Sequence, residues 1–314
     1  MLLRAFSATR RMHTKAWISD GQLALIGGRN IGDAYFDAGI SANFRDLDLL
    51  VLGKSVQQTA DLFDKYWNSA AALPIRALHP RRRIAPARLT RSLASAGQSS
   101  QARPYLQRLH ARKSIRGMLS GDNRISWTSQ AEVIADPPEK AMSAAQDVWL
   151  INFVRPVISS ASHDLQIMSP YFVPRQPGTN LLVSLVRRGV RVRVLTNSLA
   201  ATDAMAVHGA YARWREALLA GGVELFELKP YATHKRDSLF GSSVASLHTK
   251  AFTVDDRTGF VGSMNFDPRS ASLNCEMGIQ PQPCGPPITR SSATSRCGTS
   301  STPRLNARRR SRPW

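Results

Sequence analysis

The chain has 314 residues, 43% of them hydrophobic, and a formal net charge of +20, so it is long enough for one large folded domain or two ordinary ones. No apolar run approaches the ~18 residues that a membrane-spanning helix needs, and three cysteines without CxxC spacing favour neither a disulfide framework nor a zinc site. The charge is local: residues 75–125 hold twelve Lys/Arg against one acid, and residues 280–314 hold seven Arg and no acid. The remainder is nearly neutral, so the charge alone is a weak argument for nucleic-acid binding.

The first recognisable pattern begins at His13 and ends at Asn30. His13 and Lys15 lie two residues apart in an alternating stretch, and an Asp-Gly turn at Asp20 leads into the apolar residues 23–26. This pattern predicts a β-hairpin. Because residues i and i+2 share a face of a strand, we expect His13 and Lys15 to point to the same side.

A basic, proline-containing segment follows at residues 75–125, with a helix expected around residues 104–112. Two interpretations remain open for it: a surface facing anionic lipid, or a solvated helix and loop. Beyond it the pattern alternates between strands and helices, with strands expected at 164–168, 190–195 and 223–228 and helices at 180–188 and 204–220. Thr202 or Asp203 is the expected cap of the second helix. This succession predicts an α/β domain.

The first pattern recurs near the end of this α/β region. Both copies place Lys two residues after His, Asp seven, Gly fourteen and Asn seventeen residues after it, and the second copy runs from His248 to Asn265. Two matches in one register are not a chance event. The positions shared by the two copies, with the residue that follows each glycine, are His13, Lys15, Asp20, Gly27, Gly28 and Asn30, and His248, Lys250, Asp255, Gly262, Ser263 and Asn265.

Two His, two Lys and two Asn on one surface suit a phosphodiester. One imidazole can attack phosphorus while the other protonates the leaving alcohol, and ammonium and amide groups can stabilise the non-bridging oxygens. No clustered carboxylates indicate Mg²⁺ or Ca²⁺, so we expect metal-free chemistry without a cofactor. Asp20 and Asp255 are interpreted as turn residues, and five further histidines without a motif partner, His208 among them, as structural.

The duplicated motif resembles the phospholipase D, or HKD, superfamily. Residues 27–36, 44–48, 169–174 and 265–270 are similar to bacterial cardiolipin synthases, most of all the C type, and the similarity covers roughly residues 10–279. The resemblance implies an α/β fold with two pseudo-symmetric α/β/α lobes and an active site at their interface.

The resemblance also implies roles for individual residues. His13 would form a covalent phosphohistidine and His248 would be the general acid, with the reverse order left open. Lys15, Lys250, Asn30 and Asn265 would bind phosphoryl oxygens. An acid after each motif would orient a histidine: Glu276 after the second, and Asp46 after the first, with Asp48 as its rival.

These observations predict four regions: a partial first lobe at 1–74, a basic linker at 75–140, a second lobe at 141–279 and a tail at 280–314. His13 has only twelve residues ahead of it, whereas a long α/β run precedes His248, so we expect an N-terminally shortened form of a longer protein. The tail is either disordered or an out-of-frame sequence, and we favour the second.

Phosphatidyl transfer between phospholipids, with phosphatidylglycerol as one substrate, is the expected function. The alternatives are phospholipase D-type hydrolysis, a nucleic-acid phosphodiesterase and an inactive truncated remnant, and nucleic acid is the less favoured partner. A bacterial protein peripheral on the inner membrane is expected, without a spanning or signal segment in this chain.

Overall fold

The structure is a computed structural model of the chain, and it describes residues 10–39, 42–78, 86–99, 102–111, 128, 130–142, 149–230 and 244–282. The tail beyond residue 282 and residues 112–127 lie outside this part of the chain. Among the described residues no helix is both long and apolar enough to cross a bilayer.

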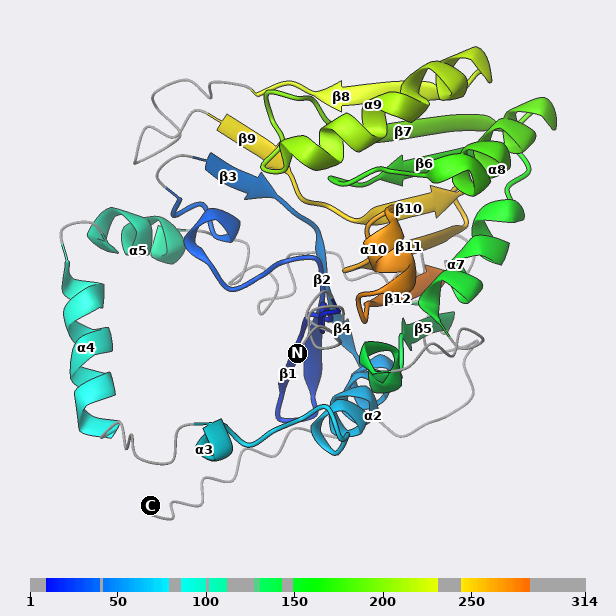
Figure 1. Ribbon diagram of the computed structural model, residues 1–314. Coiled ribbons are helices and arrows are strands. Elements are labelled where there is room, and N and C mark those ends of the chain that lie inside the picture. The colour runs from blue at the N-terminus through cyan, green and yellow to red at the C-terminus, as the bar shows by residue number, and fades with distance from the viewer. Residues whose placement is uncertain are drawn as a thin grey trace, which may run out of the picture.

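The second lobe is built on a seven-stranded sheet in the order β5-β12-β11-β10-β6-β7-β8 (Figure 1). These strands are β5 (Gln130–Ala135), β6 (Asp164–Met168), β7 (Arg191–Asn197), β8 (Glu224–Leu228), β10 (Ala251–Val254), β11 (Thr258–Gly262) and β12 (Met277–Gln282). The strands β6, β7 and β8 are parallel and are connected through α8 (Arg175–Arg187) and α9 (Met205–Ala220), which pack on each other. With α7 (Leu150–Ser159) they enclose the main apolar core. The expected alternation of strands and helices is confirmed.

The first lobe has a smaller sheet in the order β1-β2-β4, formed by β1 (Ala16–Ser19), β2 (Leu23–Gly27) and β4 (Asp48–Leu52). The helix α2 (Lys54–Trp67) packs against it, and the 3₁₀ helix η1 (Asp33–Tyr35) follows β2. Both predicted hairpins are present, β1–β2 and β10–β11. The φ angles of Asp20 and Gly21 are 49° and 65°, and those of Asp255 and Asp256 are 54° and 51°. Three residues separate the paired strand ends in each hairpin, Ser19 from Leu23 and Val254 from Thr258, and the two positive φ values in each loop reverse the chain direction.

The two lobes meet through their motif hairpins. Ile26 of β2 packs in one apolar cluster with Met277 and Ile279 of β12. A separate two-stranded parallel sheet pairs β3 (Ala42–Arg45) of the first lobe with β9 (Val244–Leu247) of the second. The two lobes therefore contact each other at two places close to the motif residues.

The segment between the lobes contains α3 (Ile75–Leu78), α4 (Pro86–Gln98) and α5 (Ala102–Ala111), so the helix expected around 104–112 is present. Two expected boundaries differ from the structure. The predicted linker to residue 140 includes β5 and the 3₁₀ helix η2 (Pro138–Ala141), because β5 pairs with β12 and extends the large sheet. The second lobe also continues past residue 279, because β12 runs to Gln282.

Candidate active site

His248 is brought to Asp46 by the parallel pairing of β3 and β9. In this register Arg45 lies opposite Leu247, so the next residue of each strand is Asp46 and His248, respectively. The backbone N–H of His248 donates to the carbonyl of Arg45 over 2.7 Å. The Nδ1 atom of His248 lies 2.6 Å from Oδ2 of Asp46, whose carboxylate is fully buried. A short strand pairing thus fixes an acid of the first lobe on the histidine of the second.

A parallel backbone pairing also positions His13, but here the second lobe supplies the acid. Met12 bridges to Cys275 in parallel, and the N–H of His13 donates to the carbonyl of Cys275 over 2.8 Å. The Nδ1 atom of His13 then lies 2.7 Å from Oε2 of the fully buried Glu276. The two acid–histidine pairs are therefore crossed, because each lobe supplies the acid for the histidine of the other. In each pair the carboxylate holds the proton on Nδ1, which leaves Nε2 for chemistry.

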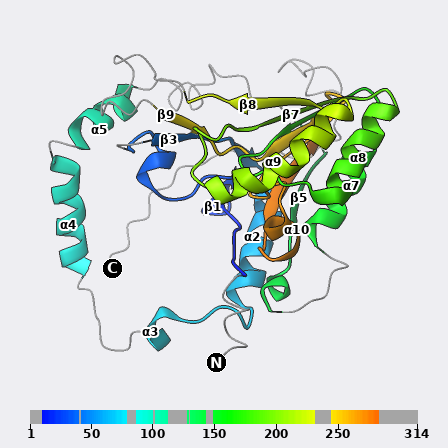
Figure 2. The same ribbon diagram turned by 45° about the horizontal axis from the view of Figure 1, so that its top comes forward.

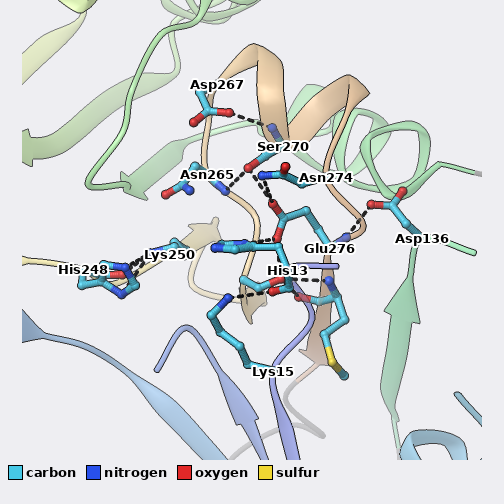
Figure 3. A network of polar contacts seen from close by, with 12 residues as sticks. His13, Lys15, Asp136, His248, Lys250, Asn265, Asp267, Ser270, Asn274 and Glu276 are labelled. Atoms are coloured by element: carbon cyan, nitrogen blue, oxygen red, sulfur yellow. Dashed lines mark hydrogen bonds and ion pairs between the residues drawn. The ribbon is translucent and has the colours of Figure 1, made fainter. Parts of the chain in front are cut away.

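Glu276 is held by more groups than His13 alone (Figure 3). The hydroxyl of Ser263 donates to Oε2 over 2.5 Å, and the hydroxyl of Ser270 donates to Oε1 over 2.8 Å. The amide of Asn274 also donates to Oε1, over 3.4 Å. Such a fully buried carboxylate needs these donors to remain charged, and they fix its position before any substrate arrives.

The motif lysines lie just before their strands rather than on them. The prediction that His and Lys share a strand face is wrong in this respect, because β1 begins at Ala16 and β10 at Ala251. Each ammonium folds back onto the carbonyl of the histidine two residues earlier, over 2.8 Å for Lys15 and 2.6 Å for Lys250. Each lysine nevertheless stays beside its histidine.

Burial sets the acidity of both ammonium groups. Removal from water lowers the pKa of Lys15 to about 8 and that of Lys250 to about 7, although the carboxylates of Asp46 and Glu276 oppose this. Burial also lowers the pKa of His248, although the hydrogen bond that its Nδ1–H donates to Asp46 opposes this. Two buried cationic groups are suited to an anionic ligand.

His248 lies in an aromatic environment provided by the first lobe. The ring of Tyr35 meets the His248 ring edge-on at 4.9 Å, and the ring of Phe44 lies 5.0 Å from it. The phenol oxygen of Tyr35 accepts a 2.7 Å bond from the amide of Asn30 and is 3.5 Å from Nε2 of His248. Asn30 therefore reaches the second histidine through Tyr35.

The remaining motif residues shape the backbone around the acids. A Cβ on Gly28 would lie 2.7 Å from Oδ1 of Asp46, so only glycine lets this carboxylate approach His248. A Cβ on Gly27 would overlap Asp48, and one on Gly262 would overlap the carbonyl of Met277.

Asn265 follows the same return strand. It is 3% exposed, its N–H donates to Ser270 over 3.1 Å, and its Oδ1 has no partner among the described residues. The motif asparagines thus differ: the side-chain amide of Asn30 donates to Tyr35, whereas the buried side-chain oxygen of Asn265 accepts no hydrogen bond among the described residues.

The two motif aspartates are turn residues, as expected, and one has a second role. The carboxylate of Asp255 accepts backbone bonds from Ser162, His163 and Asp164 over 2.7–2.9 Å. It therefore ties the β10–β11 turn to the start of β6. Asp255 lies at the far end of the hairpin from His248 and does not belong to the catalytic group.

Asp48, the rival of Asp46, has a different partner. Its carboxylate accepts a 2.5 Å bond from Nε of Arg29, and the same guanidinium donates to the carbonyls of Tyr35 and, over 3.4 Å, Asp46. Arg29 and Asp48 therefore clamp the segment that carries Asp46 and the loop that carries Tyr35. They position these residues and do not contact either motif histidine.

A buried ion pair that the sequence did not reveal supports the His13 half. Lys140 Nζ lies 2.8 Å from Oδ2 of Asp136, and both side chains are fully buried. Asp136 accepts the N–H of Glu276 over 2.8 Å, and Lys140 donates to the carbonyl of Ser270 over 3.0 Å. The pair thus connects η2 to both the acid and the helix α10 (Pro268–Ser272).

Tyr35 and Ser270 are the other contributors absent from the predicted site. Each lies five residues after a motif asparagine, Asn30 or Asn265. Extending the comparison of the two copies by five residues would have singled them out. In the described part of the chain, no group of three or more His, Cys, Asp or Glu side chains is placed to hold a metal ion.

Comparison with known proteins agrees with this geometry. Residues 154–282 match the family described as "Cardiolipin synthase, PLD-like domain". The chain is 40% identical over 276 residues to cardiolipin synthase C of Escherichia coli, covering 86% of this chain and 58% of that protein. It is 27% identical over 275 residues to cardiolipin synthase A of Pseudomonas putida, covering 87% and 44%. The chain thus spans about half the length of these relatives.

A solved structure shares the fold. The phosphatidylserine synthase of Haemophilus influenzae aligns with a TM-score of 0.56 at 16% identity, over 87% of this chain and 58% of that one. This likeness supports the two-lobed α/β architecture.

Proposed function

Because this chain belongs to the phospholipase D superfamily, we propose that it transfers a phosphatidyl group from one phospholipid to the hydroxyl of another, as a cardiolipin synthase does. The observation that carries the proposal is the crossed pairing of His13 with Glu276 and of His248 with Asp46. It leaves two Nε2 atoms for chemistry, with two buried ammonium groups beside them (Figure 3).

In the first step Nε2 of His13 attacks phosphorus and forms a P–N bond. The bond to the leaving alcohol breaks, and that oxygen takes a proton from Nε2 of His248. Glu276 stabilises the positive charge that develops on the His13 ring through Nδ1–H. Lys15 and Lys250 neutralise the non-bridging oxygens of the five-coordinate phosphorus.

In the second step His248 acts as the base. Its Nε2 accepts the proton of the entering hydroxyl, whose oxygen attacks the phosphohistidine and releases His13. Asp46 keeps a proton on Nδ1 of this ring in both steps, so that Nε2 is the atom that gives up a proton in the first step and accepts one in the second. No step requires a metal ion.

The exposures of the two histidines support this assignment of roles. The His13 side chain is 24% exposed, whereas that of His248 is 6% exposed and faces the Tyr35 hydroxyl through Nε2. The nucleophile must reach the phosphorus of a bulky lipid, whereas the acid must handle a proton in a dry environment.

Product analysis tests the proposal. Vesicles of labelled phosphatidylglycerol should yield cardiolipin and glycerol. The rate should be the same without and with EDTA. Phosphatidic acid as the main product would indicate hydrolysis instead, and cleavage of added plasmid would indicate a nucleic-acid phosphodiesterase. Alkaline quenching should retain a base-stable, acid-labile label on the protein. Inhibition by EDTA would contradict the mechanism, and so would the absence of labelled protein in a variant that turns over slowly.

A further inference from the structure

The helix α4 stands apart from both lobes (Figures 1 and 2). Among the described elements its main contact is with α5, and none of its residues is buried. A 13-residue helix without tertiary packing is marginally stable in water. Among the described residues, the contact with α5 alone leaves this helix weakly supported.

One face of α4 carries an unpaired apolar stripe. Leu89 and Leu93 are one turn apart, and Ala96 continues the row at the next turn. Leu89 is 54% exposed and Leu93 is 65% exposed. Ser95 and Gln98 lie away from this stripe, so the helix is amphipathic. Its apolar face needs a partner of low polarity. The row is shorter than the apolar face of a helix that packs into a protein core.

The charge on this segment identifies the partner. Arg88 and Arg91 belong to α4, and neither forms an ion pair with any acid in the described part of the chain. From residue 75 to residue 111 the sequence has no Asp or Glu at all. A helix that combines a short apolar stripe with unneutralised arginines is typical of the interface of an anionic bilayer.

We propose that α4 lies on the surface of an anionic phospholipid membrane. Leu89 and Leu93 enter the boundary between headgroups and acyl chains, and Arg88 and Arg91 contact lipid phosphates. The proposal rests on the proposed function to the extent that a phospholipid substrate places the enzyme at a bilayer. It decides between the two interpretations of the basic segment in favour of lipid contact.

Vesicle flotation tests the proposal without any turnover. Every variant carries His13→Ala, so that substrate conversion does not affect binding. Vesicles contain phosphatidylglycerol and phosphatidylcholine in equal parts, or phosphatidylcholine alone. The parent protein should float with the anionic vesicles, and less so as salt rises. Leu89→Asp/Leu93→Asp should weaken this binding at least tenfold, and Arg88→Gln/Arg91→Gln should weaken it about tenfold.

Leu219→Asp is the matched control, because Leu219 is a comparably exposed leucine, at 53%, on α9. It should leave flotation unchanged. Thermal melting should show that all variants keep the fold, as expected for substitutions on a helix without buried residues. Equal binding of the parent and the Leu89→Asp/Leu93→Asp variant would overturn the proposal.

Two further readings separate this proposal from others. With His13 restored, Leu89→Asp/Leu93→Asp should lose activity on vesicles and keep it on short-chain phospholipid in detergent micelles. Loss in micelles as well would assign α4 to the catalytic machinery and overturn the proposal. A change from dimer to monomer with vesicle binding intact would identify a second copy of the chain as the partner. If the protein with His13 restored is inactive on every phospholipid and the parent still floats through α4, the proposed function alone is refuted.

Discussion

The two acid–histidine pairs of the site have the same geometry but are held in place by different contacts. Glu276 is held by three side-chain donors in addition to His13, and the more exposed His13 lies above it. Asp46 accepts only the N–H of Leu47 besides His248 among the hydrogen bonds of the described residues. His248 is instead confined by aromatic rings.

The difference follows from equivalent positions in the two copies. Where the second copy has Ser263, which donates to its acid, the first has Gly28, which only makes room for its acid. Where the second has Ser270, the first has Tyr35. One half therefore fixes its acid by hydrogen bonds, and the other fixes its histidine by packing. A duplicated motif can thus support two distinct roles for the same residue type.

The largest effect is expected from removing either histidine, by at least ~10³-fold in kcat/KM. A donor with a good leaving group, such as phosphatidyl-p-nitrophenol, distinguishes the two. It does not need a general acid, so His248→Ala should still release nitrophenol and accumulate labelled protein. His13→Ala should release none. His208→Ala, on α9, is the control and should behave as the unchanged protein. Release by His13→Ala but not His248→Ala would reverse the roles.

The pH profile should fall steeply on its alkaline side. Lys250 and Lys15 must be charged to bind phosphoryl oxygens, and burial lowers their pKa values to about 7 and about 8. Raising the pH therefore removes first one positive charge and then the other. We expect kcat/KM to fall about tenfold per pH unit above 7 and more steeply above 8. A profile that stays flat to pH 9 would contradict a role for the ammonium forms.

Breaking the ion pair beneath Glu276 should destabilise the fold. Lys140→Met leaves the buried carboxylate of Asp136 without its countercharge, which costs about 3–5 kcal/mol of unfolding free energy. Urea denaturation measures this loss. Lys65→Met, on the exposed side of α2, is the control and should change the free energy of unfolding by less than about 0.5 kcal/mol. Equal stabilities would mean that the pair contributes nothing.

Gly28→Ala and Ser263→Ala compare the two equivalent positions directly. The methyl group on residue 28 would collide with the carboxylate of Asp46 and displace it from His248, so we expect a 10–100-fold loss of kcat/KM, in the range for disturbed outer-shell partners. Ser263→Ala removes one of several donors to Glu276 and should cost about tenfold. The opposite order would show that the Ser263 hydroxyl matters more than the room at Gly28.

The smallest effect is expected from Tyr35→Phe. This variant keeps the ring contact with His248 but removes the hydroxyl between Asn30 and Nε2. One neutral hydrogen bond corresponds to about a 3–10-fold change in kcat/KM. Tyr211→Phe, against Phe172 in the second-lobe core, serves as the control. If Tyr35 affects only folding, both the melting temperature and the rate should fall, with an unchanged pH profile.

Much of the site could be predicted because the motif residues occur twice at identical spacing, from His13 and from His248. The hairpins follow from local alternation and short turns, and these need no distant contacts. Asp46 was preferred to Asp48 through the resemblance alone, because what separates the two physically is the register of β3 against β9. The crossing of acids between lobes depends on the same long-range pairings.

Local rules failed where tertiary contacts compete with them. Thr202 and Asp203 were candidate caps of α9, but Ala204 occupies the cap position without a side-chain bond. Asp203 instead accepts a 2.8 Å bond from the hydroxyl of Tyr171. The strand β5 was missed within the predicted linker because its partner β12 is about 150 residues away in the chain.

The crossed pairs also constrain how activity emerges during synthesis. They join residues 263 positions apart in one case and 202 in the other. The His13 pair cannot form until Glu276 has left the ribosome, and loop closure over such separations is slow compared with local folding. Until then at least the His13 ring lacks the carboxylate that orients it. Both acid–histidine pairs can therefore be present only once the chain has been synthesised past Glu276, next to the last described strand, β12.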